Sequence, residues 1–285
     1  MTEARAYGLL VFVMALWAGN FPIAKLGLAE IGPVTLAATR AALAAPLLIL
    51  MTLLSKNPLP KFSRVDYRAF VLISLTGLVG NTTIWFWGMQ YTSPAAAGIL
   101  GASSPVVVSL AAALFLGDRI SRWNVAGIAL TTAAVLLTLS RGSLDILRSL
   151  SFNRGDFIIM ASQLSWVLYT LYSRANRSSL PPLVIQAGAH LVSLAILAPL
   201  SLLESPWTTL PLASWRAWLA ILYTAIPVTA GHLWYYKVVR TVGAGRTAVF
   251  MNLMPFAVFG LSWAVLGEAI HWYHTVGAIL VIAGV

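Results

Sequence analysis

Ten long apolar runs, separated by short polar breaks, occupy most of this 285-residue sequence. A helix of about twenty apolar residues crosses the hydrocarbon core of a bilayer, and most of the runs are close to that length. They predict ten transmembrane helices, five in each half of the chain: 6–29, 33–54, 69–91, 94–116, 123–140, 157–172, 183–203, 215–239, 244–266 and 272 to the end. The last run is shorter than the others, so we expect it to be truncated or to cross only part of the bilayer.

Composition also indicates a membrane-embedded chain. Hydrophobic residues make up 59% of the sequence and charged residues 9%, with a mean hydropathy of +0.85. A soluble domain could not bury so much apolar surface. The net charge of +10 does not indicate a nucleic-acid-binding surface, because the basic residues are scattered among the short breaks. Cysteine is absent, which excludes disulfides and thiolate metal sites.

The stretch 93–127 recurs without a gap as 243–277, an offset of 150 positions. At this offset the special residues stay in register: Pro105 with Pro255, Gly117 with Gly267, Gly127 with Gly277, and Asp118 with Glu268. Apolar helices can align by composition alone, but a proline, two glycines and an acid in register favour an internal duplication. We therefore predict two five-helix repeats, 6–140 and 155–285.

Lys and Arg residues indicate the orientation, since short cytoplasmic loops are enriched in them. If the N-terminus is cytoplasmic, twelve of the 18 basic residues lie in inner breaks, and four lie in outer breaks: Arg141, Arg148, Arg154 and Arg216. The other two, Lys25 and Arg40, lie inside helices near the outer face. Because each repeat has five helices, the second enters from the opposite side. This predicts an inverted-topology repeat of the kind found in many secondary transporters, with a non-transporting scaffold as the alternative.

Four segments of the first half resemble a known family. They are Leu16 to Phe21 together with Lys25, Arg40 early in the second helix, the turn Tyr91-Thr92-Ser93-Pro94-Ala95, and Pro105 followed by Leu116-Gly117-Asp118-Arg119. These segments resemble the EamA-type branch of the drug/metabolite transporter superfamily, and the abundance of aromatic residues is most similar to the aromatic amino acid exporters of that branch. The resemblance implies an all-α, basket-shaped membrane fold of ten helices. In that fold, helices one, three, four, six, eight and nine surround a central cavity.

Polar and aromatic residues inside the apolar runs are candidates to line such a cavity, because a polar group that faces lipid has no partner. The predicted substrate-binding residues come from both halves: Trp17, Asn20, Asn81, Trp85, Ser104, Trp166, Tyr169, His232, Tyr235 and Asn252. Each has a structural alternative, which is helix packing for the aromatic residues and His232 and interhelical hydrogen bonding for the asparagines. Pro105, Pro255 and Gly101 are predicted hinge or gate residues, because a proline removes one helical hydrogen bond.

No Asp or Glu lies in the middle of a predicted helix, so we expect no buried carboxylate of the kind that suits exporters of lipophilic cations. The buried cations are also too few for phosphorylated cargo. Aromatic rings, amides and helix ends suit a net-neutral solute, such as an aromatic or other neutral amino acid. A multidrug or dye exporter of lipophilic compounds is the second hypothesis, and a scaffold or lipid-handling protein is the third.

Sequence motifs of catalysis are missing: there is no H-E-x-x-H, no G-x-S-x-G, no Walker-type loop and no carboxylate cluster with metal-ligand spacing. We therefore expect no enzymatic activity, no catalytic residue, no cofactor and no metal. The expected partners are a small-molecule substrate and the lipid bilayer, without nucleic acid, and the expected state is a monomer in the bacterial inner membrane. Facilitated efflux and ion coupling both stay open as energy sources.

Overall fold

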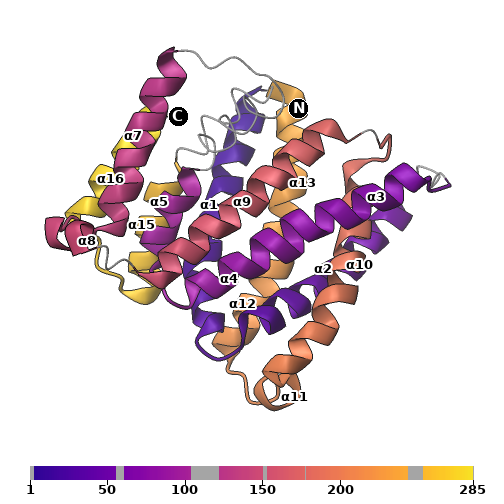
Figure 1. Ribbon diagram of the computed structural model, residues 1–285. Coiled ribbons are helices and arrows are strands. Elements are labelled where there is room, and N and C mark those ends of the chain that lie inside the picture. Colours follow the sequence, from indigo (N-terminus) through magenta and orange to yellow (C-terminus); the bar gives the residue numbers. More distant parts are fainter. Residues whose placement is uncertain are drawn as a thin grey trace.

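The computed structural model describes residues 3–55, 61–103, 122–149, 153–176, 178–242 and 253–284. Within these ranges every regular element is a helix and there is no strand (Figure 1). Five segments are long and apolar enough to cross a membrane: Arg5–Leu28, Pro33–Leu54, Arg64–Met89, Pro182–Glu204 and Trp215–Tyr235. The predicted all-helical membrane class is therefore confirmed.

The first half of the chain forms three long spans and three shorter helices within its described part. In order, its elements are α1 (Glu3–Leu28), α2 (Pro33–Leu54), α3 (Arg64–Ile73), the π-helix η1 (Ser74–Thr83), α4 (Ile84–Met89), α5 (Pro94–Ala102), α7 (Arg122–Leu139) and α8 (Leu144–Ser149). The elements α3, η1 and α4 follow one another without a gap and together form the third span. The short helix α8 was not predicted from the sequence.

The second half begins at a well-capped helix and contains one broken span. Its elements are α9 (Arg154–Ala175), α10 (Pro182–Ser201), the 3₁₀ turn η2 (Leu202–Glu204), α11 (Pro206–Thr209), α12 (Trp215–Ala225), α13 (Pro227–Val242), α15 (Met254–Leu266) and α16 (Trp272–Gly284). The predicted helix 215–239 is thus two helices, because Pro227 has no N–H to continue the hydrogen-bond ladder of α12. Of the predicted helices 94–116 and 244–266, the structure describes only the parts that contain α5 and α15.

Residues in the polar breaks set where several helices begin. Ser63 and Asp66 form a reciprocal capping box at the start of α3. The Ser93 side chain caps α5, whose first residue is Pro94, and the Ser214 side chain caps α12. A capping side chain satisfies a backbone N–H that would otherwise lack a partner, which is most costly close to lipid.

Helices from the two halves pack against each other throughout the described structure. Helix α2 packs on α10, α1 packs on α12, α13 and α15, and α9 packs on η1 and α4. Helices α7 and α16 pack on each other and on α5, away from α2 and α10 (Figure 1). The main core cluster joins α2, α4, α9 and α12 through buried residues that include Leu36, Phe86, Ile159 and Ile221.

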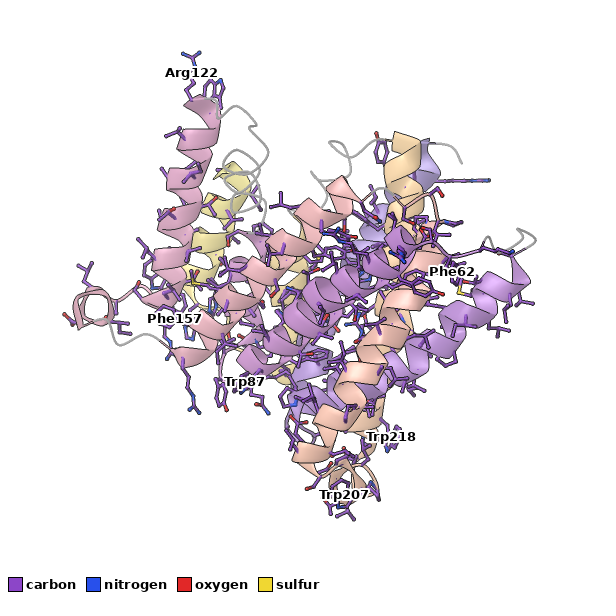
Figure 2. The ribbon with its side chains drawn as sticks, turned by 45° about the vertical axis from the view of Figure 1, so that its right-hand side comes forward. Phe62, Trp87, Arg122, Phe157, Trp207 and Trp218 are labelled. Carbon is purple, nitrogen blue, oxygen red and sulfur yellow. The ribbon has the colours of Figure 1, made fainter. Side chains whose placement is uncertain are left out.

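Large apolar side chains also cover the outside of the bundle. Trp87, Trp207 and Trp218 point away from the helices (Figure 2), and Trp207 is 60% exposed. In water such surfaces would mark an interaction patch, whereas in a bilayer they face acyl chains or the interface. Trp207 and Trp218 lie near helix ends, as expected for residues of an interfacial aromatic belt.

Candidate functional site

Trp17 lies where α1 meets α13, together with two other predicted site residues. Its ring centroid is 4.8 Å from that of His232 and 5.1 Å from that of Tyr235. The indole N–H donates to the carbonyl oxygen of Val228 at 3.4 Å. Gly231 makes this approach possible, because a Cβ there would lie only 2.7 Å from the indole nitrogen. We call Trp17, His232 and Tyr235 the aromatic cluster, and it joins a helix of each half.

Two polar groups on the same helices add hydrogen-bonding capacity. The Nδ1 atom of His232 lies 2.7 Å from the Val228 carbonyl oxygen, which can only accept, so Nδ1 carries the proton. Asn20 follows Trp17 by about one turn of α1, and its side-chain oxygen is buried without a hydrogen-bond partner in the described part of the chain. An unpaired buried acceptor costs about 1–3 kcal/mol, so a donor group of a bound solute would be stabilised there.

A second group of predicted residues lies between η1 and α9. The Asn81 amide donates to the carbonyl oxygen of Ser162 at 2.9 Å. Trp166 and Tyr169 stack on α9, with centroids 5.0 Å apart and ring planes 28° apart. Gly77 of η1 faces the Tyr169 ring so closely that a Cβ would lie 2.7 Å from a ring carbon. π-Helical segments are frequent at functional sites, and this one holds Asn81 against α9.

The remaining predicted residues that the structure describes are not part of either group. Trp85 is buried in the main core cluster, where it packs edge-on against Phe21 at 4.9 Å, so packing accounts for its position. Pro255 lies in the first turn of α15, where its missing N–H interrupts no bond of the described helix. A Cβ at Gly101 of α5 would meet nothing within 4 Å. Ser104, Pro105 and Asn252 lie outside the described residues.

Lys25 binds the turn between α4 and α5. Its ammonium group donates to the carbonyl oxygens of Met89, Gln90 and Thr92, at 3.2 Å for Gln90 and 2.8 Å for Thr92. These carbonyls lie at the C-terminal end of α4, where the helix dipole favours a cation. The turn lies at the end of the molecule that is predicted to face outward.

Two acids hold the same turn from other elements. The Thr92 hydroxyl donates to the Asp156 carboxylate at the start of α9, and the Ala95 backbone N–H lies 3.4 Å from a Glu268 carboxylate oxygen. A cavity of about 290 Å³ lies between these groups, near the lower size limit of ligand pockets. We call Lys25, Thr92, Asp156 and Glu268 the outer clamp, because they join α1, α5, α9 and the connection between α15 and α16.

Two buried polar residues of the structure, Arg40 and His190, were not selected as site residues from the sequence. Arg40 is 8% exposed, and its Nε donates to the carbonyl oxygen of Thr224 at 3.0 Å. His190 of α10 is 3% exposed. A charged residue inside a transmembrane run is a functional candidate by default, and that signal was present for Arg40. His190 gave the same signal as His232, a histidine inside an apolar run, and was missed.

The chemistry available in the described residues is non-covalent. They contain no group of three or more His, Cys, Asp or Glu side chains that could hold a metal ion. Aromatic faces, amide groups and helix ends can bind and orient a small solute, and the outer clamp connects the turn between α4 and α5 to α1 and α9. A multi-pass helical membrane protein with such groups between its halves has the features of a membrane carrier.

The comparisons with known proteins agree with this class. The model of the EamA-like transporter family matches residues 4–140 and 153–285, and the chain belongs to that family. It is 27% identical to the uncharacterized transporter YyaM of Bacillus subtilis, over 100% of this chain and 93% of that protein. It is 26% identical to a probable terminal-alkyne amino-acid exporter of Streptantibioticus cattleyicolor, again over 100% of this chain and 93% of that protein.

A further relative and one solved structure cover the chain equally well. A probable amino-acid metabolite efflux pump of Salmonella typhimurium is 24% identical, over 97% of this chain and 92% of that protein. A protein of known crystal structure superposes with a TM-score of 0.65 at 21% identity, covering 99% of this chain and 96% of the other. The protein is therefore a multi-pass membrane transporter of a family whose members are transporters, not enzymes.

Proposed function

We propose that this transporter exports amino acids, aromatic and other neutral ones, and related small metabolites across the bacterial inner membrane by alternating access. The observation that carries the proposal is the aromatic cluster, in which Trp17 of α1 meets His232 and Tyr235 of α13. Stacking of an aromatic solute on such rings contributes about 0.5–1.5 kcal/mol per ring pair beyond the area that it buries. The buried, unpaired oxygen of Asn20 offers an acceptor for an ammonium group.

In this proposal the repeats 6–140 and 155–285 lie antiparallel, with a cytoplasmic N-terminus and a monomeric chain. The outer clamp would form the closed outer gate of one state and separate in the other. We also propose Pro105, Pro255 and Gly101 as hinge or gate residues, and Ser104 and Asn252 as substrate-binding residues together with Asn81, Trp166 and Tyr169.

The cargo class is supported by the names of two relatives. The proteins of Streptantibioticus cattleyicolor and Salmonella typhimurium are named as a probable amino-acid exporter and a probable amino-acid metabolite efflux pump. A net-neutral solute also agrees with the charges of the described site, because no acidic side chain belongs to the aromatic cluster or to the group around Asn81.

Transport in proteoliposomes tests the proposal. Labelled phenylalanine, labelled threonine and a cationic dye would be followed with and without a pH gradient. We expect saturable flux of the amino acids that the dye does not inhibit. Dye flux without amino acid flux would instead support the multidrug hypothesis, and no flux of any solute would support the scaffold hypothesis.

A matched pair of variants connects the flux to the site. Trp17→Ala should lower phenylalanine flux by roughly tenfold, the loss expected for one aromatic contact and one hydrogen bond. Trp218→Ala removes a tryptophan from the outside of α12 and should leave flux unchanged. Equal flux in both variants would remove Trp17 from the site.

A further inference from the structure

Arg40 of α2 places a positive charge inside the bundle against neutral partners. Its Nε donates to the carbonyl oxygen of Thr224 at 3.0 Å, and its Nη1 donates to the hydroxyl of Thr82 at 3.2 Å. A guanidinium group has five N–H donors, so these two bonds leave donors available. A buried charge without a counter-charge is costly, and a bound anionic group would relieve that cost.

Both partners of Arg40 come from irregular helical backbone. Thr82 lies in the π-helix η1, and its hydroxyl donates to the Gly77 carbonyl five residues earlier, at 3.2 Å. Thr224 lies one turn before Pro227, where α12 ends and α13 begins. Pro227 lacks an N–H, and the break between the helices leaves carbonyl oxygens of α12 free to accept a side-chain donor. Irregular backbone at membrane depth is tolerated where it lines a polar site, which is typical of transporter binding sites.

His190 of α10 supplies an acceptor at the same place. Its Nδ1 lies 2.8 Å from the Gln186 carbonyl oxygen, so Nδ1 carries the proton and Nε2 presents a lone pair. That Nε2 is buried without a hydrogen-bond partner in the described ranges, and the histidine as a whole is only 3% exposed. Leaving it unpaired is unfavourable, and an N–H donor of a ligand would satisfy it.

Arg40 and His190 face one small cavity between α2, η1 and α10. Its volume is about 10 Å³, and its polar lining consists of Arg40, Thr82, His190 and Ser193. Such a volume holds one water-sized group, comparable to an ammonium nitrogen or one carboxylate oxygen. A larger group needs the surrounding helices to part, which the break at Pro227 and the π-helix make easier.

The cavity lies close to the aromatic cluster. Arg40 donates to the Thr224 carbonyl oxygen, and four residues later the Val228 carbonyl oxygen accepts from the indole of Trp17, whose ring contacts His232. A cationic donor group, a lone-pair acceptor and two hydroxyls therefore lie near an aromatic surface. This set matches an α-amino acid, whose head group has a carboxylate and an ammonium on one carbon beside an apolar side chain.

We propose that Arg40 and His190 form the head-group subsite of the transporter: the Arg40 guanidinium binds the carboxylate of an α-amino acid, and His190 Nε2 accepts a hydrogen bond from its ammonium group. Thr82 and Ser193 complete the subsite, and the side chain of the amino acid lies toward the aromatic cluster. This inference rests on the proposed function and adds which solutes are selected: those with both a free carboxylate and a free ammonium.

Binding of three related ligands to the purified full chain tests the subsite. The ligands are phenylalanine, 3-phenylpropionate, which lacks the ammonium, and 2-phenylethylamine, which lacks the carboxylate, with affinities measured by calorimetry. We expect wild type to bind each analogue about 10- to 150-fold more weakly than phenylalanine, the range for losing one charged hydrogen bond. Arg40→Gln should abolish the preference for phenylalanine over 2-phenylethylamine, and Arg40→Lys should restore part of it.

His190→Leu removes the acceptor and should abolish the preference for phenylalanine over 3-phenylpropionate, while the matched control His271→Leu, at an exposed histidine, should retain both preferences. If Arg40→Gln does not fold, the relative affinities of the three ligands for wild type and for Ser193→Ala still test whether the subsite binds the head group. Wild type that binds phenylalanine and 2-phenylethylamine equally would overturn the subsite. Preferences that survive Arg40→Gln and His190→Leu would also overturn it, since the two residues would then have a structural role only.

The same experiment separates the subsite from the proposed function. Wild type that binds the cationic dye and none of the three ligands would refute amino acid export, and the subsite with it. Wild type that binds and transports phenylalanine, with unchanged preferences in the variants, would refute the subsite alone.

Discussion

Replacing Gly231 by alanine tests how closely Trp17 must pack on α13. The added Cβ would lie 2.7 Å from the indole nitrogen of Trp17 and 3.2 Å from its Cδ1. Ordinary contacts of a Cβ begin at 3.4 Å, so the indole must shift by about 0.7 Å. Its bond to the Val228 carbonyl oxygen is already 3.4 Å long, and this shift would break it.

The size of the effect follows from three contributions. Overpacking costs about 1–3 kcal/mol, and the lost hydrogen bond costs about 0.5–1.5 kcal/mol. Alanine in place of glycine offsets about 1 kcal/mol through its higher helix propensity. We expect Gly231→Ala to lower the free energy of unfolding by about 0.5–3.5 kcal/mol and to weaken phenylalanine transport, because the displaced indole forms part of the proposed site.

Thermal unfolding in detergent and phenylalanine flux in proteoliposomes measure the two effects. Gly260→Ala is the matched control, because Gly260 lies inside helix α15 and a Cβ there meets nothing within 4 Å. The control should be neutral or slightly stabilising and should transport normally. If the two variants have the same Tm and the same flux, the close packing of Trp17 on α13 has no role in stability or transport.

Three further predictions concern the turns and the closely packed helices. Lys25→Met removes the ammonium group that donates to three carbonyl oxygens of the turn between α4 and α5. In a protein that also carries Ser93→Cys, the new thiol should therefore react roughly tenfold faster with an impermeant maleimide than it does with Lys25 present. An unchanged rate would contradict this. Hydrogen bonds from Ser214 hold the pKa of the Glu30 carboxyl in the folded protein below its usual range. These bonds therefore stabilise the folded state at any pH above the pKa of Glu30 in the unfolded chain, and this stabilisation is lost as the pH falls through the pKa in the folded protein. The Tm difference between wild type and Glu30→Gln should therefore be present at neutral pH and vanish in acid, and a difference that persists in acid would refute it. Gly155→Ala places a Cβ 2.8 Å from backbone atoms, which cannot move away as a flexible side chain can. The substitution should therefore lower the free energy of unfolding by about 1–3 kcal/mol, measured by thermal unfolding. Gly8→Ala should have no such effect, because a Cβ at Gly8 meets nothing within 4 Å.

Helix positions could be predicted well because apolar length and capping act locally. The predicted helix 33–54 has the same bounds as α2, since Pro33 starts it and the polar break begins at Ser55. The break between α12 and α13 could not be predicted in the same way. Pro22 and Pro46 also lie inside apolar runs, yet α1 and α2 continue through them. Whether a proline ends a helix depends on the tertiary packing that replaces its lost hydrogen bond.

The candidate site could be predicted only in part. A polar or aromatic residue in an apolar run is expected to avoid lipid or to lie at an interface, but its position in the sequence does not distinguish a packed core from a cavity. Trp17 and Trp85 have the same signal, yet one meets His232 and the other packs on Phe21. The environment of Arg40 depends on Thr224, 184 residues away, which no local pattern reveals.

The antiparallel arrangement of the two halves is the central claim, and site-directed labelling tests it most directly. The chain has no cysteine, so Asp118→Cys and Glu268→Cys each introduce a single thiol without further changes. An impermeant maleimide added to intact cells should label the cysteine at 268 and should reach the one at 118 only after the membrane is opened. Labelling of both from the same face would contradict the inverted repeat and the alternating-access mechanism that depends on it.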